Sequence, residues 1–95
     1  MKQSVKIIVK GKVQGVLYRD FAQKQAQKLG IEGTAQNAPD GSVIIYAAAS
    51  SDNLDLFIDF LYEGSSKSKV EDIIVEPLVA ARDFRRVFRV IGDHH

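Results

Sequence analysis

Hydrophobic and polar residues alternate near the start of the chain, and the period then changes. Val5, Ile7 and Val9 alternate with Lys6, Ile8 and Lys10, and this mostly two-residue period is typical of a strand. From Tyr18 to Leu29 the apolar positions fall three or four residues apart, with polar residues on the other side. The pattern therefore predicts a strand over residues 5–10, a loop over 11–18 and a helix that begins near residue 19.

The rest of the chain predicts five further elements after that helix, which Gly30 ends. A helix is predicted from the N-cap candidates at 50–53 and from a three-to-four-residue apolar stripe that closes at Gly64. The sequence Ala-Pro-Asp-Gly at 38–41 predicts a turn, because proline presets φ and glycine accepts positive φ. The predicted strands cover residues 31–37, 42–48, 70–75 (stopped before Pro77) and 87–91, and residues 76–83 are expected to be irregular.

This order of elements, βαββαβ with a short fifth strand, predicts the fold class. We expect an α+β ferredoxin-like two-layer sandwich, with an antiparallel sheet and two helices on one face, as a single domain over residues 1–95. In such a fold strand 42–48 separates the first strand from strand 31–37. The loop after the first strand and the end of strand 31–37 then share one edge of the sheet, about 10 Å apart, or two strand spacings.

The net charge, the lack of cysteine and the lack of a long apolar run limit the classes of function that we expect for the chain. The chain has 95 residues with a net charge of +1, so a broad electrostatic footprint for nucleic acid is not expected. It has no cysteine, which excludes disulfides and thiol nucleophiles. No apolar run approaches the roughly 20 residues of a membrane span, and the N-terminus does not read as a signal peptide. We therefore expect a cytoplasmic protein that does not contact membranes.

The stretch GKVQGVLYRDF, residues 11–21, carries the candidate chemistry. It reads neither GxGxxG nor GxxxxGK[ST], but a glycine-containing loop before a helix can bind an anion through backbone N–H groups. Arg19 adds a planar cation suited to phosphate oxygens. Taken alone, the two glycines of this stretch are equally explained by a tight turn. Asn37 is likewise explained as an ordinary turn former beside Pro39.

Two longer motifs change that balance. Residues 11–19 match G-x-V-Q-G-V-x-aromatic-R after an aliphatic residue, and residues 33–43 match G-aromatic-x-x-N-x-x-x-G-x-V except at the aromatic. With both motifs at the right separation, the sequence resembles the acylphosphatase family over nearly its whole length. Tyr18 departs from the usual phenylalanine or methionine, and Thr34 replaces the aromatic residue.

The resemblance implies an enzyme that hydrolyses acyl phosphates, which are mixed anhydrides of a carboxylic acid and phosphate. It implies that Arg19 binds the phosphoryl group, that Asn37 holds the attacking water, and that no metal, cofactor or covalent phosphoenzyme takes part. Inorganic phosphate is then both a product and a competitive inhibitor. We expect the protein to be a monomer. The implied phosphate cradle consists of Gln14, Gly15, Val16, Leu17, Tyr18 and Arg19.

An alternative hypothesis is a phosphate- or RNA-binding ferredoxin-like module without turnover. Its basis is a basic cluster interleaved with aromatic residues, because such sheets can bind RNA on aromatic platforms. The RNA-recognition signature is absent, however, and we interpret the cluster as a solvated strand face. His94 and His95 are interpreted as terminal residues, not metal ligands. The cluster consists of Arg82, Arg85, Arg86 and Arg89, with Phe84 and Phe88.

Overall fold

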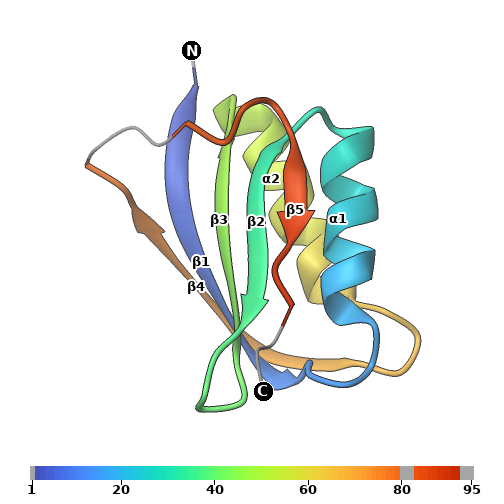
Figure 1. The fold of residues 1–95 in the computed structure, drawn as a ribbon. Coiled ribbons are helices and arrows are strands. Elements are labelled where there is room, and N and C mark those ends of the chain that lie inside the picture. Colours follow the sequence, from blue (N-terminus) through green and yellow to red (C-terminus); the bar gives the residue numbers. More distant parts are fainter. Residues whose placement is uncertain (1, 80–82, 93–95) are drawn as a thin grey trace.

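The computed structural model describes residues 2–79 and 83–92 and contains seven elements in these ranges (Figure 1). They follow the order βαββαββ along the chain. The elements are β1 (Gln3–Lys12), α1 (Tyr18–Lys28), β2 (Glu32–Asn37), β3 (Val43–Ala49), α2 (Ser51–Glu63), β4 (Lys69–Pro77) and β5 (Phe88–Val90).

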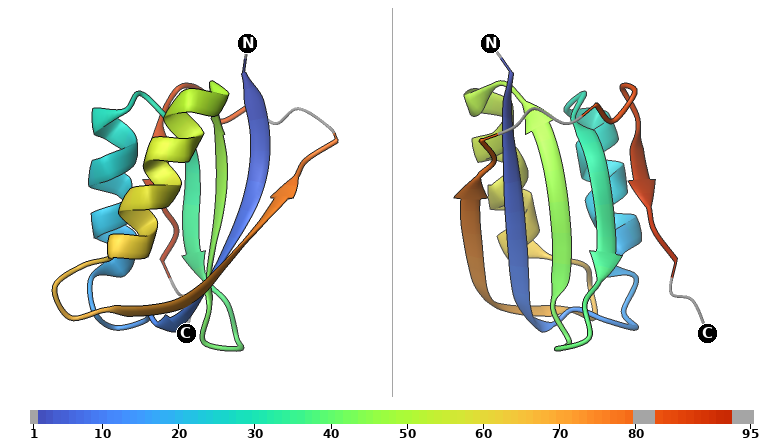
Figure 2. Two further views of the ribbon diagram at one scale, coloured as in Figure 1. Left: turned by 180° about the vertical axis from the view of Figure 1, so that it is seen from behind. Right: turned by 60° about the vertical axis from the view of Figure 1, so that its left-hand side comes forward.

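One five-stranded sheet and one layer of helices make up the molecule. The strands lie in the order β4-β1-β3-β2-β5, and α1 and α2 cover the same face of the sheet (Figure 2). The predicted ferredoxin-like sandwich is therefore confirmed, including the place of β3 between β1 and β2. The β1–α1 loop and the β2–β3 turn lie at the same end of the sheet, as the topology required (Figure 1).

Strand ends and one pairing differ from the prediction. β1 continues through Gly11 to Lys12, beyond the predicted end at residue 10, because a register shift after Lys10 keeps it paired with β4. β4 includes Pro77, where we expected it to stop. An edge strand tolerates proline because one side of its backbone has no strand partner. β5 pairs with β2 in parallel, so the sheet is mixed and not purely antiparallel.

The core lies between the sheet and the helices. Alternate residues of β1 and β3, including Ile7 and Ile45, are fully buried, which explains the two-residue period of the sequence. α2 contributes Phe57, whose ring meets that of Phe88 edge-on at 6.0 Å between centroids. Ser50 caps α2 by accepting a hydrogen bond from the Asn53 backbone N–H, and Gly64 ends it with φ 75°, as predicted.

Candidate active site

The loop between β1 and α1 is short, because β1 runs to Lys12 and α1 begins at Tyr18. Two of its residues have left-handed backbone conformations: Gly15 with φ 72° and Leu17 with φ 61°. Turns of this kind direct successive N–H groups into one concavity, which is a common anion-binding arrangement. Leu17 is also the N-cap of α1 and has no side-chain acceptor for the first N–H groups of the helix. The loop therefore joins a backbone concavity to the positive end of a helix dipole.

Gln14 fastens this loop to the turn that follows β2. Its side-chain Nε2 donates hydrogen bonds to the carbonyl oxygens of Ala38 and Ser42, each at 2.8 Å. The Ala38 N–H also donates to the Ser42 carbonyl at 2.9 Å, so the turn is closed on itself. The amide N–H₂ group of Gln14 therefore holds the two segments together, which leaves its backbone as the part that can belong to the expected phosphate cradle.

Arg19 lies in the first turn of α1 and is half-buried. Its Nη1 donates a hydrogen bond to the Ile91 carbonyl at 2.6 Å, just after β5. This bond orients the guanidinium from a segment 72 residues away. A guanidinium has five N–H donors in a planar fork, so its geometry suits phosphate oxygens as well as this carbonyl.

Arg19 lines a hollow of about 220 Å³ together with Gly15, Leu17 and Tyr18 of the loop. The volume is below the roughly 300–1,000 Å³ of sites for drug-sized ligands, which fits a small anion better. Asp20 also lines the hollow and is opposite in charge to Arg19. The attraction for an anion must therefore come from the backbone N–H groups as well as from Arg19. Sequence reasoning missed Asp20, although its place beside Arg19 was visible.

Asn37 is the last residue of β2 and is half-buried. Side chains alternate along a strand, and Ala35, two residues earlier, is fully buried in the core. The Asn37 side chain therefore leaves β2 on the face that the helices cover, at the end of the sheet where the loop lies. Asn37 is not among the residues that line the hollow beside Arg19. The structure brings the two motifs together at one sheet end, with Gln14 as the link.

Asp40 shapes the turn after Asn37, as the sequence predicted. Its Oδ1 accepts hydrogen bonds from the Ser42 hydroxyl at 2.6 Å and from the Ser42 N–H at 3.0 Å. Hydrogen bonding of the ionised carboxylate, chiefly by the Ser42 hydroxyl, holds the pKa of Asp40 below its ordinary value. Asp40 therefore acts on the shape of the turn.

Tyr18 contributes to the core with its side chain and to the loop only with its backbone. The ring is buried, and the hydroxyl donates a hydrogen bond of 2.7 Å to the Leu61 carbonyl in the last turn of α2. Burial raises the pKa of Tyr18 far above its ordinary value, so the hydroxyl stays protonated. The departure at this position thus adds a link between the two helices.

The second departure, Thr34, lies on the sheet face away from the helices, opposite Tyr46 of β3. Thr34, Tyr46 and Phe84 line one hollow on that face, and Phe84 is 6% exposed. The segment that precedes β5 therefore brings an aromatic ring to the region where Thr34 lacks one.

The basic and aromatic cluster does not form an exposed aromatic platform. Phe88 is buried in the core against Phe57, and Phe84 is buried as well. The Arg86 N–H donates to the buried carboxylate of Glu32 at 2.8 Å, and the Lys2 ammonium lies 3.1 Å from the same carboxylate. Arg82, His94 and His95 lie outside the described residues.

Within residues 2–79 and 83–92, no group of three His, Asp or Glu side chains is arranged to hold a metal ion. In the same ranges, neither helix has the length and apolar character needed to cross a membrane.

The fold and the loop define a class: a small α+β sandwich with a glycine-containing strand–loop–helix connection at one sheet end. The acylphosphatase family model matches residues 5–90. An acylphosphatase of Thermus thermophilus is 46% identical over 69 residues, which cover 73% of this chain and 78% of that relative. The chain belongs to the acylphosphatase family, and it is accordingly a hydrolase of acyl phosphates.

Solved structures agree with this assignment. The crystal structure of acylphosphatase from Bacillus subtilis superposes with a TM-score of 0.89 at 35% identity, covering 97% of this chain and all of that one. An acylphosphatase from Coxiella burnetii gives a TM-score of 0.86 at 29% identity, covering 95% of this chain and 93% of that one. The resemblance inferred from the two motifs is thereby confirmed.

Proposed function

We propose that Arg19 and the backbone of residues 14–19 bind the phosphoryl group of the substrate, and that Asn37 holds the attacking water. Water then attacks phosphorus in line, a P–O bond forms, and the bond between phosphorus and the acyl oxygen breaks. The carboxylate leaves and the proton passes to solvent or to the released phosphate. On this proposal the unit that acts is a single domain, works as a monomer, and is inhibited competitively by inorganic phosphate.

Hydrolysis of an acyl phosphate needs little general acid or base catalysis. An acyl phosphate already carries a good leaving group, so the task is to bring water to an anionic phosphorus. Positioned N–H groups and an arginine offset charge on the phosphoryl oxygens, and a fixed amide orients the water. The Asn37 amide has an oxygen that accepts from water and an N–H₂ that donates to a phosphoryl oxygen.

The observation that carries this proposal is the double hydrogen bond of Gln14. Its Nε2 lies 2.8 Å from the carbonyls of both Ala38 and Ser42, which holds the loop of Arg19 against the turn that follows Asn37. The two motifs that hold the proposed catalytic groups are thus parts of one local structure.

Two alanine variants test the separate roles. Arg19→Ala should abolish both turnover of an acyl phosphate and inhibition by inorganic phosphate. Asn37→Ala should keep the phosphate inhibition constant near the wild-type value and slow turnover by about 10²-fold, as loss of one positioned amide does elsewhere. Wild-type turnover in Asn37→Ala would falsify the assignment of the water, and unchanged phosphate inhibition in Arg19→Ala would do the same for the phosphate site.

A further inference from the structure

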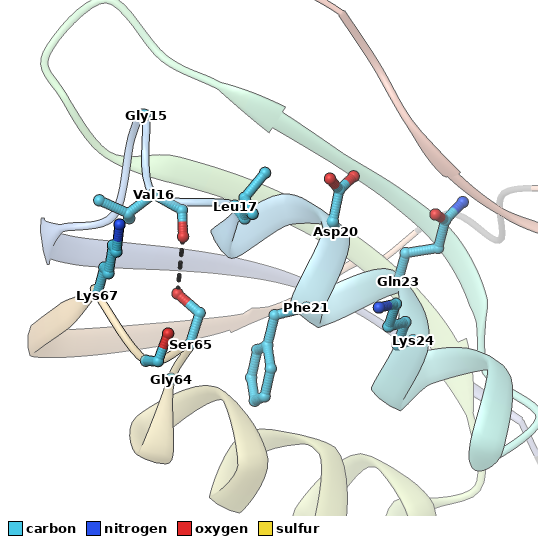
Figure 3. Close-up of a pocket in the computed structure, with 11 residues that line it drawn as sticks. Gly15, Val16, Leu17, Asp20, Phe21, Gln23, Lys24, Gly64, Ser65 and Lys67 are labelled. Atoms are coloured by element: carbon cyan, nitrogen blue, oxygen red, sulfur yellow. Dashed lines mark hydrogen bonds between the residues drawn. The ribbon is translucent and has the colours of Figure 1, made fainter.

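A groove of about 690 Å³ runs along the outer side of the phosphate loop (Figure 3). One wall is the first half of α1, and the other is the segment that joins α2 to β4. The Ser65 hydroxyl donates a hydrogen bond of 3.0 Å to the Val16 carbonyl, so the second wall is tied to the loop. The groove is therefore formed before any ligand arrives. Its lining includes Val16, Leu17, Phe21, Lys24, Ser65 and Lys67.

This groove adjoins the hollow beside Arg19, because Gly15, Leu17 and Asp20 line both spaces. A phosphoryl group bound at Arg19 would have the groove as its immediate neighbour. The substituent on that phosphoryl group needs only to pass Leu17 to enter it.

Leu17 is unusual among the residues that line both spaces. Its side chain is 75% exposed, although leucine is apolar, and its backbone has φ 61°, a conformation that favours glycine or asparagine. It occupies the variable position of the first motif. Neither burial nor backbone preference explains a leucine here, whereas contact with an apolar group of a ligand does.

We propose that this groove binds the acyl group of the substrate and that Leu17 is its principal apolar contact. The site then favours bulky apolar acyl groups, aromatic or branched aliphatic, over acetyl. Phe21, half-buried and packed against the core, adds a second apolar side chain to the lining of the groove. Lys24 and Lys67 add positive charge, which suits an anionic substrate. The inference rests on the proposed function, because it needs the phosphoryl group at Arg19.

The test compares kcat/KM for benzoyl phosphate and acetyl phosphate in the wild type and in Leu17→Asn. Asparagine accepts the left-handed conformation, so this variant should fold at least as well as the wild type. The benzoyl-to-acetyl ratio should fall by about five- to tenfold, because a phenyl group loses its apolar contact and acetyl loses little. Comparing ratios between variants cancels the different intrinsic reactivities of the two substrates.

Leu17→Met and Leu56→Asn are the matched controls. Leu17→Met keeps a long apolar side chain and should hold the ratio within about twofold of wild type. Leu56 is an exposed leucine of α2 that does not line the groove, so its replacement should leave the ratio unchanged. An unchanged ratio in Leu17→Asn, with both substrates still hydrolysed, overturns the proposal for the acyl group and leaves the proposed function standing. Wild-type protein that hydrolyses neither substrate overturns the proposed function and, with it, this inference.

Discussion

Tyr18 places a hydroxyl inside an apolar core, and the end of α2 supplies its acceptor. The last carbonyls of a helix have no partner within the helix, and the Leu61 carbonyl is one of these. The Tyr18 hydroxyl donates to it at 2.7 Å. One side chain thereby satisfies two polar groups that would otherwise be buried at a cost of about 1–3 kcal/mol each.

The raised pKa of Tyr18 makes stability depend on alkaline pH. The folded protein keeps the phenol proton, while the unfolded chain releases it near the ordinary value of about 10. Above that pH the unfolded state binds fewer protons, so the free energy of unfolding falls, by about 1.4 kcal/mol per pH unit. Tyr18→Phe should lower stability by about 1 kcal/mol at pH 7 and remove this extra alkaline loss.

Urea denaturation at pH values from 8 to about 11.5 measures the difference, a range that spans the ordinary tyrosine pKa. Tyr62→Phe, at a tyrosine that is 52% exposed, controls for loss of a phenol hydroxyl at the surface. Parallel stability curves for wild type and Tyr18→Phe above pH 10 would contradict the proton linkage.

Among the elements, β1 depends most on a single glycine. Gly11 has φ 129° at the point where β1 shifts register against β4, and a Cβ there would overlap the Lys69 carbonyl oxygen. The strand therefore reaches the active loop only because this position has no side chain.

Gly11→Ala should lower the free energy of unfolding by about 2 kcal/mol or more, because strain and overlap act together. Gly41→Ala is the matched comparison, since Gly41 has φ 94° but open space around an added Cβ. It should cost only about 1 kcal/mol. Urea denaturation measures both variants, and equal losses would show that contact with β4 does not matter.

Most of the elements can be predicted from local signals along the chain. The helices follow from their apolar stripes and from Gly30 and Gly64, and the β2–β3 hairpin follows from Pro39-Asp40-Gly41. The errors at Lys12 and Pro77 have one cause. Both ends are decided by pairing between β1 and β4, which no short window of sequence contains. The parallel direction of β5 likewise depends on a long return path of the chain.

At the scale of the whole molecule, the site is assembled from segments that are distant in sequence. Gln14 lies 24 residues from Ala38 and 28 from Ser42, and its hydrogen bonds hold the two motifs in one arrangement. If Arg19 and Asn37 have the roles proposed above, the distance between the phosphate and the water depends on this one side chain.

Gln14→Met keeps the length of the side chain and removes both hydrogen bonds. Two turn carbonyls lose this donor, so stability should fall by about 1–3 kcal/mol. Turnover should fall by about tenfold or more, because small misplacements of reacting groups are costly, while phosphate inhibition should change less. Gln36→Met, the same change beside Asn37, is the control. A wild-type kcat in Gln14→Met would show that the link does not position the site.

The sequence could single out Arg19 and Asn37 as candidate site residues because their motifs are long and specific. It could not identify Ile91, whose carbonyl orients Arg19, because a backbone acceptor leaves no mark in residue type. Nor could it show that the amide of Gln14 is engaged by the turn. These relations exist only after the sheet has brought separate segments together.

The bond between Arg19 and Ile91 has a consequence for folding during synthesis of the chain. A ribosome makes Arg19 early and Ile91 some 72 residues later, which takes seconds at about 5–20 residues per second. Until then a nascent chain can pair β1, β2 and β3, but the bond from Arg19 to the Ile91 carbonyl has not yet formed. If Arg19 binds the phosphoryl group as proposed, we expect the final orientation of this side chain to wait until the segment after β5 has been made.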